Sequence, residues 1–556
     1  MFDLESHPFP EQVLSGRRDI SRSESRIALA FSFVLVIITF LIFAANPVPS
    51  EDASILFRYS ENVASGHGIV YNPGGPTVDG ATDMLFMLAL AGLNSLGIRV
   101  ELAAALVNAL SLGAIVFLLY LSWRRWAGVV VGWALLPVAV ILVGPVWQYG
   151  QLGYGTPTFA AACTMVAVLS EVSSRHPSRR NLLVLGLFVG IAGLVRPEGF
   201  ILAPLVIAAQ AFRTRSWRLL LVPGAIWLPI VAAFVGWRAL YFGYPFPNPF
   251  YKKGGGTLHL VALVTMAMFV AQAGLPLVAG LATGLAVPAS RRRAVSLAAV
   301  LVGWGAAWLL MSDEMNVFYR FQYSVLPVLL VLCAPLYREM RQGLMRTSVI
   351  LTRVSLAFLL TATTAGVGYT AQTFLRPAVK SFIGQVSNPE RARQESRVVQ
   401  VAEVLSANTT GARRTVASTE AGYVAWKSGW TVTDLWGLND KAIAHHGYMD
   451  VAQLTELSPE VIFAHVPTGN RQVSSVATAS SFLPGWTDMT EPLLCFAHRQ
   501  GYVLLGQWGD SDSLVVLGRP DIPDLKSLQA QFATVEVSGA RNSASAGVLP
   551  TPTGCA

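Results

Sequence analysis

Charged residues are scarce in this chain of 556 residues: Asp, Glu, Lys and Arg make up 13%, while 53% of the residues are hydrophobic. Soluble proteins carry about 25% charged residues, so the composition excludes an ordinary soluble protein. Apolar runs of about 17–25 residues, the length that a membrane-spanning helix needs, recur up to residue 375. No such run follows in residues 376–556. We therefore expect a helical membrane body followed by a globular module.

Cysteine is also rare, with four residues in the whole chain. Cys163 and Cys333 lie inside apolar runs, as buried small hydrophobic residues do. Cys495 and Cys555 both belong to the C-terminal module. If that module lies outside the cytoplasm, the pair can form a disulfide, although the sequence allows two free thiols equally well.

The sequence shows no cleavable signal peptide. A polar stretch of 26 residues precedes the apolar run 27–45 and carries four arginines: Arg17, Arg18, Arg22 and Arg26. This pattern predicts an uncleaved signal-anchor with a cytoplasmic N-terminus. The formal charge of +8 has a related origin, because most arginines lie in short loops between apolar runs, where positive charge fixes topology. Nucleic-acid binding is therefore not expected.

The positive-inside rule also decides which apolar runs cross the membrane. Five loops carry fourteen arginines, and all five face the cytoplasm if the short segment 83–98 lies in the interface instead of crossing. Eleven spans are then expected, near residues 27–45, 101–123, 127–146, 156–172, 181–196, 198–212, 219–240, 268–288, 295–311, 323–337 and 354–375. An odd number of spans places the C-terminal module outside.

This topology divides the chain into four parts. We expect a cytoplasmic tail (1–26), a membrane domain (27–375) with a first outer loop (46–100), an extracytoplasmic α/β domain (376–539) and a flexible tail (540–556). The α/β character rests on strand-like segments at 414–418, 431–434, 461–464 and 503–505, together with a helical segment at 390–406.

Two acids, Glu51 and Asp52, follow the first span on the outer side. Carboxylates at a membrane surface can take a proton from a hydroxyl or hold a divalent cation. The alternative is a purely structural role, because acids after Ser50 are favourable in the first turn of an interfacial helix. Both interpretations can hold, since a helix start fixes a carboxylate in place.

Few cations lie in the outer loops, namely Arg58, Arg99, Arg196, Arg238, Lys252, Lys253 and Arg320. They are not needed for topology, so we predict anion binding. The alternative for each is anchoring of a helix end by snorkelling. Pro197 breaks the helix beside Arg196, and three prolines between Tyr244 and Phe250 stiffen a loop into a rim. Equally, these segments can be a hairpin turn with a local ion pair and an interfacial aromatic belt.

Several of these segments together resemble one family. The acid pair with Ala53, Phe57-Arg58-Tyr59, Tyr71-Asn72-Pro73-Gly74, Val78-Asp79-Gly80 with Thr82, Arg196-Pro197-Glu198-Gly199, the Tyr241-to-Lys252 segment and Asp434-to-Asp440 are similar to segments, in that order, of GT-C-type membrane glycosyltransferases. Among such enzymes, the segments are similar to those of the arabinofuranosyltransferases that cap arabinan in mycobacterial and corynebacterial cell walls. This chain departs from them in having Glu51 for Asp, Asp79 for Glu, and Gly155 where a Gly-Leu-Glu-Thr-like sequence has its Glu.

The resemblance implies an activity. Such enzymes take a sugar, here a pentose such as arabinofuranose or a hexose, from a polyprenyl-phosphate donor at the outer face of the bacterial inner membrane. They pass it with inversion to a hydroxyl of a cell-envelope glycan or glycolipid. No nucleotide-binding Gly-rich unit is then needed, because the donor is anchored in the lipid bilayer. No cofactor is certain, and a divalent cation held by Glu51 and Asp52 is left open.

The same resemblance assigns roles to particular residues. Asp52 is expected to be the general base, with Glu51 as the second candidate or as a group that orients Asp52 or a metal. Donor phosphate or sugar contacts are expected from Arg58, Tyr59, His67, Arg196, Glu198, Arg238, Asn248, Tyr251, Lys252 and Arg320. Acceptor contacts are expected from Asp79, Asp434, Asn439 and Asp440. A structural role for His67 and a simple turn at 439–440 are the alternatives.

Two other classes of function remain open. A lipid or solute transporter would place charges at mid-membrane, with broken helices and internal repeats. An inactive envelope-assembly protein would keep the scaffold without the chemistry. The outer position of the ionisable residues and the lack of a clear repeat favour the enzyme over the transporter.

Overall fold

The computed structural model describes residues 22–46, 48–347, 349–389, 396–409, 414–467, 483–508, 512–535 and 555. Most of the predicted cytoplasmic tail (residues 1–21) and of the predicted C-terminal tail (540–554 and 556) therefore lies outside the described residues.

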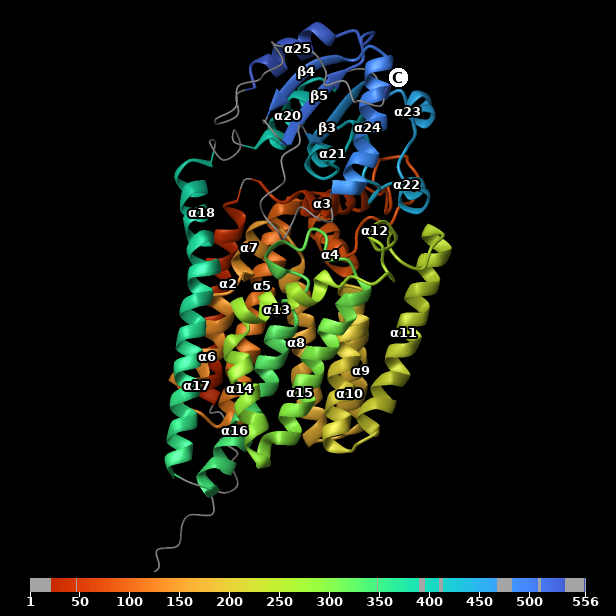
Figure 1. Cartoon of the computed structure of the whole chain (residues 1–556). Coiled ribbons are helices and arrows are strands. Elements are labelled where there is room, and N and C mark those ends of the chain that lie inside the picture. The colour runs from red at the N-terminus through yellow and green to blue at the C-terminus, as the bar shows by residue number, and fades with distance from the viewer. Residues whose placement is uncertain are drawn as a thin grey trace, which may run out of the picture.

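Apolar helices of different lengths stand side by side and form the membrane body in the lower part of the molecule (Figure 1). They are α2 (Arg22–Ala44), α5 (Val100–Ser122), α6 (Val131–Leu142), α8 (Thr156–Arg175), α9 (Arg179–Val195), α10 (Gly199–Thr214), α11 (Arg218–Phe242), α13 (Val261–Ala273), α14 (Leu275–Ala286), α15 (Pro288–Ala307), α16 (Val325–Thr347) and α17 (Val349–Thr370). A helix α18 (Arg376–Ser387) continues from α17 towards the C-terminal module (Figure 1).

Among the described residues, six helices are long and apolar enough to cross a membrane, or seven if the bent pair α13–α14 is one span. Each of the eleven predicted spans overlaps a helix, but several of these helices are shorter than the ~20 residues that a bilayer requires. The number eleven therefore stays a prediction. The span predicted at 268–288 is not one continuous helix, because α13 and α14 meet at 93° around Gly274.

Short helices lie between the membrane body and the module (Figure 1). They are α3 (Glu51–Ala64), α4 (Met84–Ser95), α7 (Val146–Gln151) and α12 (Asn248–Lys252). Helix α3 begins at Glu51 because the Ser50 hydroxyl accepts a hydrogen bond from the Ala53 amide at 3.1 Å, so the predicted helix start is confirmed. Helix α4 has 12 residues and a length of about 18 Å, too short to cross the membrane.

The C-terminal module contains a five-stranded sheet in the order β2-β1-β3-β5-β4. Strands β1 (Thr415–Ser418), β2 (Thr431–Asp434) and β3 (Val461–Pro467) are parallel, and β5 (Asp512–Gly518) runs antiparallel to β3 and to β4 (Val503–Trp508). The helices of the module are α20 (Arg397–Ala407), α21 (Tyr423–Lys427), α22 (Lys441–His446), α23 (Val451–Leu457), α24 (Leu483–Arg499) and α25 (Leu525–Ala533). Cys495 of α24 forms a disulfide with Cys555, whereas Cys163 and Cys333 are buried and free.

Alternate residues of the strands face two different cores. Val416 and Phe463 belong to a core that includes α20 and α21 and continues into the membrane body, whereas Ala417 and Ile462 belong to a second core with α24. The continuity is visible at α3, where the ring of Phe57 packs edge-on against Trp426 of α21 at 5.1 Å. Membrane body and module are therefore packed against each other.

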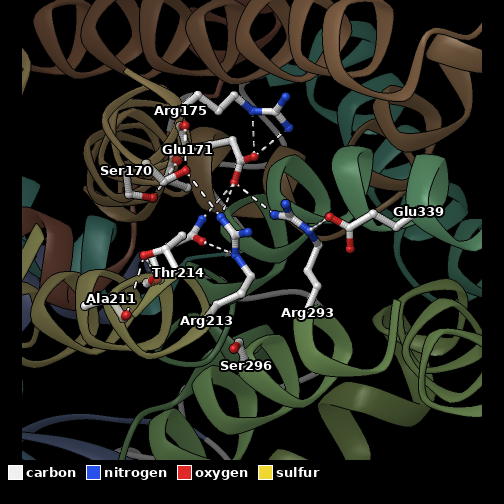
Figure 2. Close-up of polar contacts among 12 residues, drawn as sticks. Ser170, Glu171, Arg175, Ala211, Arg213, Thr214, Arg293, Ser296 and Glu339 are labelled. Atoms are coloured by element: carbon white, nitrogen blue, oxygen red, sulfur yellow. Dashed lines mark hydrogen bonds and ion pairs between the residues drawn. The ribbon is translucent and has the colours of Figure 1, made fainter. Parts of the chain in front are cut away.

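Near the C-terminal end of α8, a buried carboxylate connects α8 with α10 and α15 (Figure 2). Glu171 of α8 is fully buried and pairs with Arg293 of α15 at 2.9 Å, Arg175 at 2.7 Å and Arg213 of α10 at 3.5 Å. Arg293 also contacts Glu339 of α16 at 2.9 Å. Three arginines that the sequence assigned to membrane topology thus form one ion-pair cluster, the Glu171 cluster.

Candidate active site

A cavity of about 350 Å³ lies where the membrane body meets the module. Its apolar part is lined by Ile201 of α10 and by Val231, Phe234 and Val235 of α11. Its polar part combines three carboxylates with four cations: Asp52, Asp83, Glu198, Arg196, Arg238, Lys253 and Arg320. One cavity thus offers both an apolar surface and a concentration of charge.

Asp52 reaches this cavity from the first turn of α3 and forms an ion pair with Arg320, whose side chain is 7% exposed. Burial alone would raise the pKa of Asp52, but the positive charges of Arg320, Lys253 and Arg196 outweigh this effect and hold the pKa below its ordinary value. The carboxylate is therefore ionised at neutral pH. An ionised carboxylate facing a cavity can accept a proton.

Arg320 lies in a strained loop between α15 and α16. Met315, Phe318 and Tyr319 have φ values of 60°, 55° and 60°, which side chains of this size rarely adopt. Each such residue costs on the order of 1–3 kcal/mol and persists only where the surroundings fix it. The guanidinium of Arg320 lies 4.2 Å from the centre of the Tyr154 ring, which fixes its position above Asp52.

Arg196 occupies the turn between α9 and α10. Pro197 ends α9, and Arg196 has extended dihedral angles (φ −144°, ψ 140°). Its guanidinium pairs with Glu198 at 2.9 Å, as the local ion-pair interpretation expects, and with Asp83 at 3.0 Å. Burial would lower the pKa of Arg196, but the two carboxylates raise it instead, so the residue stays charged.

Asp83 lies beside Gly155, one of the positions at which this chain departs from the sequences that it resembles. A Cβ atom on Gly155 would lie 2.4 Å from the Asp83 carboxylate and 3.0 Å from the Phe86 ring, so a side chain at position 155 would displace them. A carboxylate therefore lies beside residue 155 although the residue itself contributes none. Asp83 was not among the predicted site residues, and its only signal in the sequence is its place directly after Thr82.

The two lysines of the rim, Lys252 and Lys253, follow the proline-rich segment 244–250 and have different surroundings. Lys253 lines the cavity, with Nζ 3.9 Å from Glu314, whereas Nζ of Lys252 lies 3.4 Å from the centre of the Tyr448 ring in the module. Adjacent residues at a helical turn point about 100° apart, which separates the pair. Burial lowers the pKa of Lys252 to about 8. The structure thus brings Lys253 to the cavity and not Lys252, to which the sequence analysis assigned the donor contact.

Glu51 points away from Asp52 and into the module. Its carboxylate accepts hydrogen bonds from the amides of Gly422 at 2.8 Å and Tyr423 at 3.1 Å. The acid pair is therefore split between two tasks, one facing the cavity and one tying α3 to α21. In the part of the chain that the structure describes, no group of three or more His, Cys, Asp or Glu side chains could hold a metal ion.

Glu51 is expected to make the stability of the protein depend on pH. Burial, followed by the charge of Glu420, raises the pKa of Glu51 from 4.5 to about 8. Between these values the folded chain keeps a proton that the unfolded chain releases, so the free energy of unfolding falls as the pH rises, by up to ~1.4 kcal/mol per pH unit. Glu51→Gln keeps an acceptor for both amides and stays neutral. Thermal unfolding across this range should show a flatter pH profile for Glu51→Gln, and identical profiles would contradict the assignment.

Several other predicted contacts do not line the cavity. Arg58 is buried and donates from Nε to the Tyr71 carbonyl at 2.9 Å, and the fully buried Tyr59 hydroxyl accepts from the Gly80 amide at 3.3 Å. His67 is exposed, and Tyr251 packs against His445 of the module with ring centres 4.3 Å apart. Arg58 and Tyr59 thus hold the first outer loop together, whereas Tyr251 joins α12 to the module.

The acceptor-side residues of the module lie in a tight turn after β2. The Asp434 carboxylate accepts from the amides of Trp436, Gly437 and Asn439 and from the Asn439 side chain. Asp440 caps α22 by accepting from the Ile443 amide at 3.0 Å. The capping contact of Asp440 agrees with the predicted turn at 439–440, and Asp434 stabilises the same turn. Oδ1 of Asn439, however, lies against Gly80 of the first outer loop, where an added Cβ atom would be only 2.0 Å from it.

Comparisons with known proteins bear on fold more than on function. Residues 385–523 match a family model described as "Domain of unknown function (DUF8728)". A comparison with curated proteins gave no match. ArnT from Cupriavidus metallidurans, in a structure bound to undecaprenyl phosphate, aligns over 90% of this chain and 99% of its own, with a TM-score of 0.57 and 14% identity. The apo structure of the same protein aligns over 91% of this chain and 99% of its own, with a TM-score of 0.59 and 14% identity.

A third structure, the arabinofuranosyltransferase AftD from Mycobacteria, aligns over 90% of this chain but 40% of its own, with 14% identity and a TM-score of 0.45. The ArnT alignments cover nearly the whole of both chains and show a shared fold. The chain is therefore a helical membrane protein with a GT-C-like fold, which confirms the fold that the sequence resemblance implied.

Proposed function

We propose that this protein is a membrane glycosyltransferase that moves a sugar from a polyprenyl-phosphate donor to a hydroxyl of a cell-envelope glycan or glycolipid. One observation carries the proposal: the ionised Asp52 carboxylate faces a cavity that joins an apolar surface to four cations. The GT-C-like fold supports it, as does the undecaprenyl phosphate bound to ArnT, which has that fold.

In the proposed reaction, Asp52 takes the proton of the acceptor hydroxyl. The hydroxyl oxygen attacks the anomeric carbon from the side opposite the phosphate, and the bond between this carbon and the phosphate oxygen breaks. The polyprenyl phosphate leaves with the bonding electrons, and the configuration at the anomeric carbon is inverted. Arg196, Lys253 and Arg320 stabilise the negative charge that develops on the leaving phosphate.

The lipid part of the donor fits the apolar part of the cavity. The side chains of Val231, Phe234 and Val235 belong to α11. Only 11% of the most apolar 18-residue stretch of this helix is buried inside the protein, so the cavity adjoins a helix that is open to lipid. An isoprenoid chain in the bilayer can therefore approach along α10 and α11 while its phosphate meets the cations.

We further propose that residues 27–375 form the membrane domain and that residues 376–539 form a domain outside the cytoplasm of the bacterial inner membrane. The Cys495–Cys555 disulfide supports this sidedness, because disulfides persist in oxidising compartments. Arabinofuranose is the candidate sugar, on the strength of the sequence resemblance. A cytoplasmic N-terminus follows from the same topology.

A broken helix pair such as α13–α14 also occurs in transporters. Neither of these helices contains a charged residue, however, and the charged cavity lies among other elements. The arrangement therefore favours the enzyme over transport.

The two lysines of the rim provide a matched test. Purified protein is incubated with a panel of polyprenyl-phosphate-linked sugars and glycan acceptors, and wild type is expected to transfer one of them. Lys253→Ala should raise the KM for the donor about tenfold or more, since a hydrogen bond to a charged group contributes about 1.5–3 kcal/mol. Lys252→Ala removes the same charge from the neighbouring position and should leave this KM unchanged.

Mass spectrometry of lipids that copurify with the protein checks the donor independently of turnover. A bound polyprenyl-phosphate sugar would identify the donor directly. Absence of transfer by wild type with every sugar, together with no copurifying polyprenyl lipid, would contradict the proposed function.

A further inference from the structure

A second cavity, of about 690 Å³, lies between the membrane body and the module. The membrane body contributes Ala44 at the end of α2, together with Arg99 and Glu101 at the start of α5. The module contributes Glu403 of α20 and Lys427 of α21. Among the described residues that line it, none is predicted to contact the sugar donor or the acceptor. We refer to it as the second cavity.

Helix α3 separates the second cavity from the active-site cavity. Asp52, Ile55 and Leu56 lie on one face of α3 and line the active-site cavity. Phe57 lies about 140° around the helix from Asp52 and packs against Trp426, which lines the second cavity, with ring centres 5.1 Å apart. The reaction proposed for Asp52 therefore does not use the second cavity.

The second cavity lies where two membrane helices end on the side of the module. Helix α2 ends at Ala44, and only 22% of its most apolar 18-residue stretch is buried inside the protein, so α2 is open to lipid. Helix α5 begins at Val100 beside this end, and α20 and α21 belong to the module above both helices (Figure 1). A ligand of the second cavity therefore lies at the depth of the lipid headgroups, and hydrocarbon chains can follow α2 into the bilayer.

The second cavity is lined by charges of both signs in equal number. Among the described residues that line it, Arg99 and Lys427 are cations, and Glu101 and Glu403 are carboxylates. Arg99, Glu403 and Lys427 are exposed, and the Arg99 side chain is 73% exposed although it pairs with Glu101. Exposed ion pairs are weak, so these groups can turn to a ligand at little cost. The cavity therefore suits a ligand that carries both a negative and a positive group.

A zwitterionic phospholipid headgroup has this chemistry. Its phosphate can accept hydrogen bonds from Arg99 and Lys427, and its ammonium group can donate to Glu101 and Glu403. A headgroup with negative charge alone would be repelled by the two carboxylates. A primary ammonium group carries three N–H donors, whereas a quaternary ammonium group has none to offer a carboxylate. The lining thus favours a headgroup with a primary amine.

A neutral glycan is the alternative ligand. The aromatic residues among the described lining residues are Tyr423 and Trp426, which are 5% and 6% exposed. Nζ of Lys427 also lies 3.5 Å from the centre of the Trp426 ring. Neither ring offers an open face on which a sugar could stack. The charges and the position at the ends of α2 and α5 therefore favour the lipid.

We infer that the second cavity binds the headgroup of a zwitterionic phospholipid with a primary amine. The bound headgroup contacts the membrane body and the module at once, so it stabilises the docking of one on the other. This inference depends on the helical membrane fold and not on the proposed sugar transfer.

The test compares phosphatidylethanolamine, phosphatidylglycerol and phosphatidylcholine with identical acyl chains. Native mass spectrometry of the full-length protein in detergent measures the affinity for each lipid. Wild type should bind phosphatidylethanolamine about fivefold more tightly than phosphatidylglycerol, the effect of one exposed charge pair. Phosphatidylethanolamine should also raise the temperature of thermal unfolding, because it binds the folded protein. Equal or tighter binding of phosphatidylglycerol would overturn the zwitterionic headgroup, and equal binding of phosphatidylcholine would overturn the primary amine.

Two variants locate the binding site. Glu403→Gln should weaken binding of phosphatidylethanolamine about fivefold and leave phosphatidylglycerol unchanged or more tightly bound, whereas Arg99→Gln should weaken binding of both lipids. Both residues are exposed, so both variants are expected to fold. Glu456→Gln and Lys526→Gln are the controls, because they remove exposed charges of the module that do not line the second cavity. Lipid affinities of Glu403→Gln and Arg99→Gln equal to those of the controls would overturn the site.

The kinetics of sugar transfer identify the alternative ligand. If an acceptor glycan occupies the second cavity, Glu403→Gln leaves all lipid affinities unchanged and raises KM for the acceptor, which would overturn the lipid site. Lipid binding is measured without turnover. Failure of wild type to transfer any sugar would therefore contradict the proposed function and leave the test of the second cavity intact.

Discussion

Replacing Asp52 with asparagine is expected to lower the rate of sugar transfer about 10²–10⁴-fold, the range that a general base contributes. The asparagine side chain has nearly the same shape, and its carbonyl oxygen can still accept the hydrogen bond from Arg320. It cannot take up the proton of an attacking hydroxyl. The protein should therefore stay folded and bind its donor while losing the chemical step.

The measurement is kcat at saturating donor and acceptor, with thermal unfolding and donor binding as controls. Donor affinity should be unchanged or higher, because the substitution removes a negative charge from a cavity that receives a phosphate. Asp52→Ala should also lose activity, but it leaves Arg320 without its partner and tests stability as well. A kcat near that of wild type in both variants would show that another group is the base.

The pH dependence of kcat provides a second test of Asp52 as the general base. Because Arg320, Lys253 and Arg196 hold the pKa of Asp52 below its ordinary value against the effect of burial, Asp52 stays ionised throughout the neutral range. Transfer by wild type should therefore not decline as the pH falls through the neutral and mildly acidic range. A loss of kcat centred between pH 5 and 7 would point instead to a base of higher pKa.

The local features of this site could be predicted from the sequence because they depend on neighbouring residues. Ser50 and the acids after it predict the start of α3, and Pro197 predicts the break that holds Arg196. The asymmetric distribution of arginines predicts the side of the membrane for the acids and the outer cations, and this side remains a prediction. Such signals lie within a few residues of the feature that they specify.

Pairings between distant segments could not be predicted in this way. Asp52 and Arg320 are 268 residues apart, and Asp79 and Arg238 are 159 apart, so no local pattern links them. The choice between Lys252 and Lys253 depends on a rotation of about 100° per helical residue, which a short rim segment does not reveal. Glu51 contacts the module and Asp52 faces the cavity for the same reason, since adjacent side chains of a helix point in different directions.

Glu171→Ala is expected to be the most destabilising substitution considered, with a loss of about 3–5 kcal/mol in the free energy of unfolding. Glu171 is fully buried and neutralises Arg293, which is 4% exposed, and Arg213, which is 16% exposed (Figure 2). Without the carboxylate, these guanidinium groups stay buried close together and repel each other. Breaking a buried ion pair from one side costs far more than the pair contributes.

Glu339→Ala is the matched control within the same cluster. Its carboxylate is 33% exposed and contacts Arg293 alone among the arginines of the cluster, so its loss should cost about 1 kcal/mol or less. Thermal unfolding of both variants in detergent measures the difference, and equal stabilities would contradict the central role of Glu171. Because the Glu171 cluster lies at the ends of the helices opposite the cavity, KM for the donor should be unchanged in the fraction of Glu171→Ala that remains folded. The arginines that are predicted to set the membrane topology would then also hold α8, α10, α15 and α16 together, far from the reacting groups.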